Sequence, residues 1–153
     1  MNLSSLVDLN RAIRENRVDE VTRQLGREPG MRALATGSGA SRWEWQPEGE
    51  RVANPFGFLN GGYLAVFVDV LQSSAIGSVL TDEELATTAE FKVEFIRPAA
   101  IALLRGESQV LHKGSRVAFV EASIFAASGE LLVKSSSTWT ILRQRGERPP
   151  QKS

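Results

Sequence analysis

The spacing of hydrophobic residues divides the chain into segments with different periods. From residue 61 to about residue 78 the sequence is apolar almost throughout, and Leu64, Val68 and Leu71 recur at helical spacing. This run is too long for one strand, so the pattern predicts a helix that begins near Gly61. Further apolar residues lie off the main stripe, which is typical of a helix enclosed on several sides. We therefore expect this helix to form the centre of the fold.

After this helix the hydrophobic spacing changes to two, the period of a strand. Residues 91–95 alternate apolar and charged side chains until Arg97-Pro98 ends the segment. The other alternating segments are residues 41–46 before the helix and residues 103–113, 116–126 and 130–142 after it, with glycine-containing turns between the last three. One strand, one buried helix and four strands joined largely by hairpins predict an α+β fold, in which an antiparallel sheet packs one face on the helix.

The N-terminal residues predict one amphipathic helix outside this domain. Ser4 or Ser5 can cap it, and its apolar positions run from Leu6 to Leu25 before Gly26 ends it. We expect this helix to pack against the domain edge or a partner subunit, and residues 36–40 to form a flexible loop. The predicted organisation is a helical extension over residues 1–30, one domain over residues 31–142 and a disordered tail over residues 143–153.

Composition narrows the function without identifying it. The chain has 153 residues, of which 42% are hydrophobic, enough for one sizeable core. Eighteen basic and 18 acidic residues give a formal net charge of zero, so no global basic field exists to bind nucleic acid. The absence of cysteine excludes disulfides and thiolate catalysis, and a single histidine, His112, makes a His-rich metal site or a Ser-His-Asp triad difficult within one chain. We expect no metal, no signal or membrane-spanning segment, and a cytoplasmic location.

Asp69 interrupts the apolar helix and needs an explanation. A carboxylate on an enclosed helix is costly unless it is paired or hydrogen-bonded. One explanation is that Asp69 lies on a wet stripe of the helix with Gln72 and Ser73. Another is that it pairs with a buried arginine, and a third is that it has a chemical role. The helix pattern by itself leaves all three open.

Several short motifs around this helix occur in a particular order. They are Asn54, Asn60-Gly61-Gly62, Val68-Asp69 and Phe95-Ile96-Arg97-Pro98-Ala99. Their order and spacing resemble the acyl-CoA thioesterase branch of the hotdog-fold superfamily, of the phenylacetate-pathway type, over roughly residues 52–142. The resemblance implies an antiparallel sheet wrapped around a central helix, with the N-terminal helix as an extra element. It also implies hydrolysis of an acyl-CoA thioester to a free acid and a thiol, with coenzyme A as part of the substrate and no cofactor.

The same resemblance implies roles for individual residues. Asp69 matches the helix carboxylate that acts as general base on water or as nucleophile, and Gly61 matches the residue whose backbone N–H polarises the thioester carbonyl. Asn54 matches a loop amide near the reacting centre, and Thr88 matches a Ser or Thr that helps to hold the attacking water. These assignments agree with physical expectation, because a helix N-terminus has unpaired N–H donors where negative charge develops. Asn60 departs from the family pattern, since it stands where histidine is usual and cannot titrate.

The remaining expected site residues lie at the helix start and at strand ends. They are Gly62 and Tyr63, together with Arg97, Lys113 and Arg116 as cations for the phosphates of coenzyme A. The resemblance also implies a homodimer or homotetramer in which the loop and helix start of one subunit face the carboxylate of the other.

Two other functions stay open at this point. One is a hotdog domain that binds acyl-CoA, or only dimerises, without hydrolysing a thioester. The other is dehydratase-type chemistry, which uses a histidine that this loop lacks.

Overall fold

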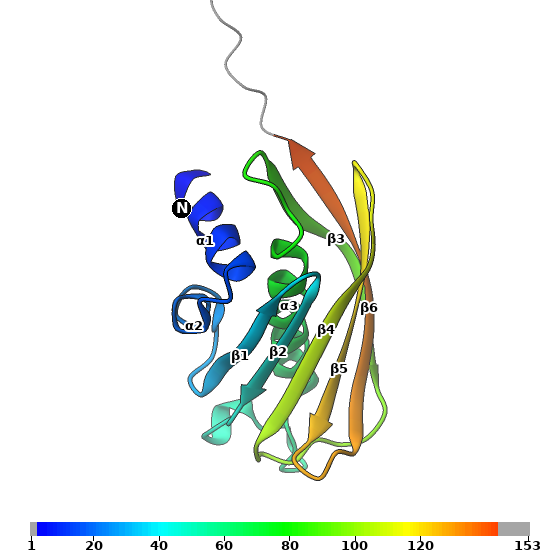
Figure 1. The fold of residues 1–153 in the computed structure, drawn as a ribbon. Helices are drawn as coiled ribbons and strands as arrows, with labels where there is room; N and C mark the ends of the chain where they lie inside the picture. Colours follow the sequence, from blue (N-terminus) through cyan, green and yellow to red (C-terminus); the bar gives the residue numbers. More distant parts are fainter. Residues whose placement is uncertain (1–2, 144–153) are drawn as a thin grey trace, which may run out of the picture.

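The computed structural model describes residues 3–143, and these form a curved sheet with helices on its inner side (Figure 1). In chain order the elements are α1 (Leu3–Arg14), α2 (Val18–Leu25), β1 (Met31–Gly37), β2 (Ala40–Trp45), the 3-10 helix η1 (Glu50–Val52), α3 (Gly61–Gly77), β3 (Glu84–Phe95), β4 (Leu104–Lys113), β5 (Val117–Ala126) and β6 (Leu131–Arg143).

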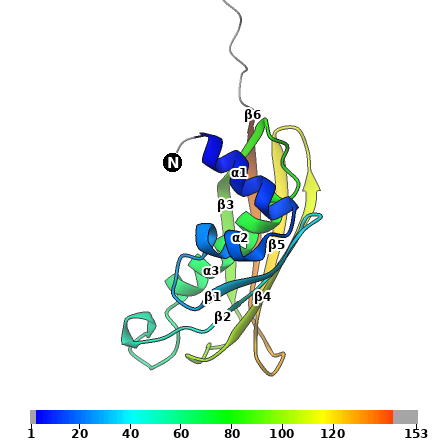
Figure 2. The same cartoon turned by 60° about the vertical axis from the view of Figure 1, so that its left-hand side comes forward.

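The strands form one antiparallel six-stranded sheet in the order β1-β2-β4-β5-β6-β3. The sheet wraps around α3, and α1 and α2 lie on the same side, against α3 and β1 (Figure 2). The predicted α+β fold is confirmed: an antiparallel sheet encloses a central helix, with extra helical structure at the N-terminus. The order leaves β1 and β3 at the two edges of the sheet.

Helix α3 is the best-buried element because large side chains of the sheet close over it. Trp43 of β2 is fully buried, and its Nε1 donates a hydrogen bond to the Ser74 hydroxyl of α3 at 2.9 Å. A Cβ at Gly106 on β4 would lie 2.6 Å from Leu71 Cδ1, so glycine at this position lets the sheet come close to the helix. The predicted central helix is confirmed, and it ends at Gly77, one residue before the expected limit.

The N-terminal segment forms two helices where one was predicted. The chain breaks at residues 15–17, where Asn16 has φ 55° and its Oδ1 accepts the backbone N–H of Thr36 at 2.8 Å. The hydrophobic spacing conceals this break because both helices bury apolar side chains in the main core, including Leu9 of α1 and Val21 of α2. The predicted extension therefore packs into the domain.

Strand β1 was not predicted, and the predicted flexible loop at residues 36–40 is instead the end of β1, a tight turn at Ser38 and Gly39, and the start of β2. Ser38 has φ 53° and Gly39 has φ 78°, both in the left-handed region that suits such turns. Two of the seven residues of β1 are alanines, which are poor strand formers, so the local composition does not indicate a strand. Its pairing with β2 forms it instead.

The strand predicted at residues 91–95 begins earlier, at Glu84, and pairs with β6 rather than with the next strand β4. The connection after Phe95 is therefore not a hairpin. Residues 144–153, which make up most of the predicted tail, lie outside the described residues. Within residues 3–143, no helix has the length and apolar character that crossing a bilayer requires.

Candidate active site

Helix α3 begins with a capped first turn. Asn60 lies just before the helix in an extended conformation, and its Oδ1 accepts the Gly62 N–H at 2.8 Å. The N–H groups of Tyr63 and Leu64 donate to the Asn60 carbonyl oxygen. For the Gly61 N–H, no acceptor occurs among residues 3–143. This free donor lies at the positive end of the helix dipole, where a negative charge is stabilised.

The loop before α3 is organised around Asn54. Its Oδ1 accepts the backbone N–H of Phe56 at 2.9 Å and that of Phe58 at 3.1 Å, an arrangement typical of a turn centred on Asn. The Leu59 N–H then donates to the Ala99 carbonyl at 2.8 Å, which joins the loop to the segment after β3. Because the Asn54 oxygen is occupied, the group that this side chain can offer a ligand is its NH₂ donor.

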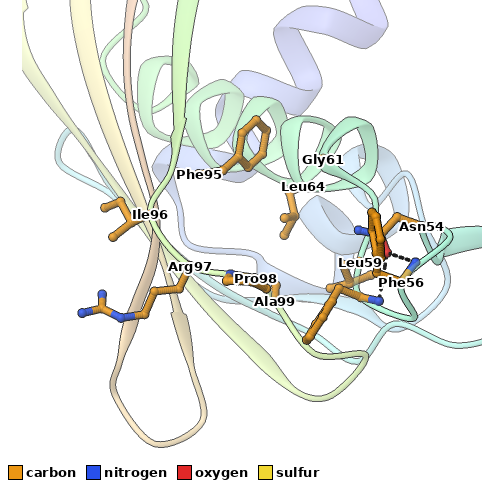
Figure 3. Close-up of a pocket in the computed structure, with 11 residues that line it drawn as sticks. Asn54, Phe56, Leu59, Gly61, Leu64, Phe95, Ile96, Arg97, Pro98 and Ala99 are labelled. Carbon is orange, nitrogen blue, oxygen red and sulfur yellow. Dashed lines mark hydrogen bonds between the residues drawn. The ribbon is translucent and has the colours of Figure 1, made fainter.

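An open pocket of about 590 Å³ lies between this loop, the start of α3 and the segment after β3 (Figure 3). It is lined by Asn54, Phe56, Phe58, Leu59, Gly61, Leu64, Phe95, Ile96, Arg97, Pro98 and Ala99. Of the predicted site residues, the pocket brings together Asn54, Gly61 and Arg97. Arg97 is held beside it by Glu130, whose Oε1 is 2.6 Å from Nε.

Three phenylalanines of this pocket were not predicted as site residues. Phe56 is 85% exposed, and Phe58 and Phe95 also expose much of their rings. A Cβ on Gly61 would lie 3.0 Å from Phe95 Cζ, so the Phe95 ring covers the helix start closely. For Phe56 and Phe58 the sequence offered one indication, since large aromatic residues in a turn-rich loop have no core to enter.

Asp69 and Thr88 form a second group of predicted residues, away from this pocket. The Thr88 hydroxyl of β3 is 3.5 Å from Asp69 Oδ1, a long hydrogen bond. Asp69 is exposed to solvent in the single chain, yet the protein around its carboxylate displaces enough water to raise the pKa of Asp69 above its ordinary value. The Thr88 hydrogen bond and the charge of Arg27 act in the opposite direction and lower that pKa less strongly.

The wet stripe considered for Asp69 does not extend to Gln72. Gln72 is fully buried, its Nε2 donates to the Ser135 hydroxyl at 3.2 Å, and its Oε1 has no hydrogen-bond partner within the described part of the chain. Ser73 is half-buried. Asp69 is the one carboxylate on α3, and Arg27 acts on it from a distance rather than through a salt bridge.

The two groups of residues are separated along the helix. Asp69 lies eight positions after Gly61 in α3, and at about 1.5 Å per residue this separates the two residues by about 12 Å along the helix axis. One carbonyl group cannot contact both within one chain. Each chain therefore carries two parts of a candidate site, the Gly61 pocket and the Asp69–Thr88 pair, at different positions along α3.

The other predicted residues lie elsewhere. Lys113 forms a salt bridge of 2.9 Å with the buried Glu84, and Arg116 lies in the turn that follows β4, at the end of the sheet opposite the Gly61 pocket. The Tyr63 hydroxyl accepts a hydrogen bond from Arg51 at 3.2 Å, and Tyr63 does not line the pocket. The Gly62 N–H is already used in its hydrogen bond to Asn60 Oδ1. Within residues 3–143, no three His, Cys, Asp or Glu side chains are grouped to hold a metal ion.

Comparison with known proteins gives a family match. A family model described as the thioesterase superfamily matches residues 56–133. A 1,4-dihydroxy-2-naphthoyl-CoA hydrolase from Escherichia coli (strain K12) is 33% identical over 97 residues, which cover 63% of this chain and 71% of that protein. A protein of Saccharolobus solfataricus described as a candidate esterase is 28% identical over 95 residues, which cover 62% of this chain. The match spans 63% of that relative, less than two thirds of its length.

A solved structure gives the corresponding match in three dimensions. It is a candidate thioesterase from Ralstonia eutropha JMP134, described as related to phenylacetic acid degradation. The two chains have a TM-score of 0.70 and 24% identity, over 86% of this chain and 98% of that chain. This likeness confirms the predicted hotdog fold.

Proposed function

The chain belongs to the thioesterase superfamily, and we propose that it hydrolyses acyl-CoA thioesters to a free acid and coenzyme A. The observation that carries this proposal is the Asp69 carboxylate on the central helix, hydrogen-bonded to Thr88 and with a pKa raised by the protein around it. A carboxylate with a raised pKa is a stronger base than one in free solution, as proton abstraction from water requires. The coenzyme A hydrolase among the relatives supports a CoA thioester as substrate.

In the proposed reaction, the thioester carbonyl lies between the Asp69 carboxylate and a Gly61 N–H. Asp69 accepts a proton from a water molecule, which the Thr88 hydroxyl helps to hold, as the water oxygen adds to the carbonyl carbon. The Gly61 N–H stabilises the negative charge that forms on the carbonyl oxygen. The carbon–sulfur bond then breaks, and the sulfur leaves with the proton that Asp69 had taken. Direct attack by the carboxylate, followed by hydrolysis of the anhydride, is a second route open to the same residue.

The separation of about 12 Å between Gly61 and Asp69 supports a site built from two subunits. The Gly61 and Asn54 of one subunit would then act on a thioester held by the Asp69 of its partner. Strand β3 supports this arrangement, because it is an edge strand of 12 residues that exposes Phe91 and Phe95. A long edge strand with exposed aromatic side chains favours pairing with a second copy.

The pocket beside Gly61 is the proposed site for the thiol side of the substrate. It is largely apolar, as suits the pantetheine arm, and Arg97 supplies a cation at its rim for a phosphate group. Both cations pair with a carboxylate, but Lys113 is the weaker candidate within one chain, because its partner Glu84 is buried whereas the Glu130 beside Arg97 is exposed. Arg116 and Lys113 both lie at the other end of the sheet.

The proposal is tested by thiol release from acyl-CoA esters of short, medium and long chain and from phenylacetyl-CoA. We expect hydrolysis of at least one class, with kcat/KM in the range of a working enzyme, above about 10⁴ M⁻¹s⁻¹. A chain that binds an acyl-CoA without releasing thiol would be a binding module, and Asn60 would then mark that change. A chain that neither binds nor cleaves would share only the fold with the family.

The pH dependence of this activity should report the Asp69 carboxylate. Catalysis needs the ionised form, so kcat/KM should fall at acidic pH. The midpoint of this acidic limb of the pH profile should lie above the ordinary pKa of aspartate, because burial raises the pKa of Asp69. Thr88→Val removes the hydrogen bond that lowers this pKa, so the limb should move to higher pH. The control Thr140→Val on β6 should leave the limb in place. A Thr88→Val enzyme that loses activity equally at every pH would show that Thr88 does not tune the base.

A further inference from the structure

A second apolar pocket, of about 320 Å³, lies between α1, the C-terminal half of α3 and the edge of the sheet. Aliphatic side chains from five elements make up most of its wall, with Trp139 of β6 as the one aromatic residue. The lining residues are Leu6, Leu9, Asn10, Ile13, Leu25, Arg27, Ser73, Ile76, Gly77, Leu80, Leu85, Ala86, Thr87, Trp139 and Leu142. It shares none of them with the pocket beside Gly61.

Three observations place one end of this pocket next to Asp69. Ser73 lines it and lies one helical turn after Asp69, on the same face of α3. Ala86 lines it and lies two residues before Thr88, on the same face of β3, and Thr88 is the hydrogen-bond partner of Asp69. Arg27 lines it and is close enough for its charge to act on Asp69.

The residues of α1 form a firmly held outer wall. A Cβ at Gly77 of α3 would lie 2.6 Å from Ile13 Cδ1, so the two helices pack with no space between them at this point. Arg14 donates to the Leu80 carbonyl at 2.6 Å, and Arg11 donates to Asp82 at 2.9 Å. These contacts tie α1 to the connection between α3 and β3, so the wall that α1 forms is held in place.

From this geometry we infer that the pocket receives the acyl chain of the substrate, and that it selects straight aliphatic chains of medium length. At roughly 30 Å³ per non-hydrogen atom, about the volume of a water molecule in the liquid, 320 Å³ holds about ten such atoms. Aliphatic lining matches an aliphatic chain, and α1 closes the far side. This inference rests on the proposed function, since it assigns the acyl side of the thioester to the subunit that supplies Asp69.

The test compares kcat/KM for straight-chain acyl-CoA esters of 2 to 16 carbons and for phenylacetyl-CoA. We expect a rise of about fourfold per added methylene, the ratio for burying one CH₂ group, up to about ten carbons, and no further rise beyond. Ala86→Phe should fill much of the pocket and lower the ratio of decanoyl-CoA to butanoyl-CoA efficiency at least tenfold. Leu6→Ala should widen it and move the optimum to longer chains. Ala40→Phe, the same change at an exposed position of β2, should not alter the ratio.

Calorimetric binding of decanoate to the wild type, Ala86→Phe and Ala40→Phe separates the two proposals. If no thioester is cleaved but decanoate binds and Ala86→Phe abolishes binding, the hydrolase proposal fails and the pocket assignment stands. If thioesters are cleaved with no dependence on chain length, or phenylacetyl-CoA is preferred to decanoyl-CoA, the pocket assignment is overturned and the hydrolase proposal survives. Decanoate that fails to bind the wild type also overturns the assignment.

Discussion

Asp69→Asn is expected to lower kcat for acyl-CoA hydrolysis by about a hundredfold or more, the scale of losing a general base. Asparagine has the size of aspartate and can still accept the Thr88 hydrogen bond, but it cannot take a proton from water or attack a carbonyl. The measurement is steady-state thiol release on the best substrate of the panel. Asp19→Asn on α2 replaces an exposed helical aspartate in the same way and should keep the full rate.

The stability of Asp69→Asn distinguishes lost chemistry from lost structure. Burial raises the pKa of Asp69 in the folded chain above its unfolded value, so the folded chain holds this proton more tightly. Stability therefore falls as pH rises from the unfolded pKa through the folded pKa, and at neutral pH the ionised carboxylate is destabilising. The variant should melt at no lower temperature than the wild type. A variant that keeps more than a tenth of the wild-type kcat would remove Asp69 from the mechanism.

Gly61→Pro is expected to lower kcat by about 100- to 1000-fold, as loss of an oxyanion donor does. Proline has no backbone N–H, so it removes the proposed oxyanion donor. The first position of a helix is where proline is best tolerated. Asn60, with φ −66° and ψ 135°, already has the extended conformation that a following proline requires. The matched control is Gly61→Ala, which keeps the N–H and meets the Phe95 ring in the same way. Equal losses in the two variants would assign the effect to Phe95.

Mixing the two inactive variants tests whether the site is shared. A mixed dimer of Asp69→Asn and Gly61→Pro chains contains one site with both residues intact, because each chain supplies the half that the other lacks. Random exchange of subunits should restore about a quarter of the wild-type rate. No recovery after exchange, or a monomeric mass by light scattering at micromolar concentration, would contradict the two-subunit site.

The central helix and the loop before it were predictable because their signals are local. A long apolar run after glycine punctuation has few interpretations, and it located α3 within one residue of its end. Strand β1 and the break at Asn16 were not predictable in this way. The alanines of β1 become a strand through pairing with β2, and the break is stabilised by a hydrogen bond to Thr36, 20 residues away. Contacts between residues this far apart cannot be predicted from local composition.

The residues of the candidate site also divide into those with a local signal in the sequence and those that depend on distant contacts. The family resemblance proposed Asn54, Gly61 and Asp69 as site residues, and the rise per residue of a helix gives the separation between the last two. The capping role of Asn60 was also available from sequence, since asparagine is a preferred residue before a helix. The pairing of Lys113 with Glu84 joins residues far apart in the chain and had no local indication. The wall that α1 contributes to the second pocket likewise exists only after the helices pack.

The exposed edge of β3 makes the folded single chain prone to aggregation. A strand of 12 residues with unpaired backbone groups along one side, and with Phe91 and Phe95 beside them, can add any complementary strand and not only its own copy. Substitutions that weaken self-pairing should therefore yield insoluble aggregates before they yield inactive monomers. In the proposed two-subunit site, the same edge would therefore link the activity of the protein to its solubility.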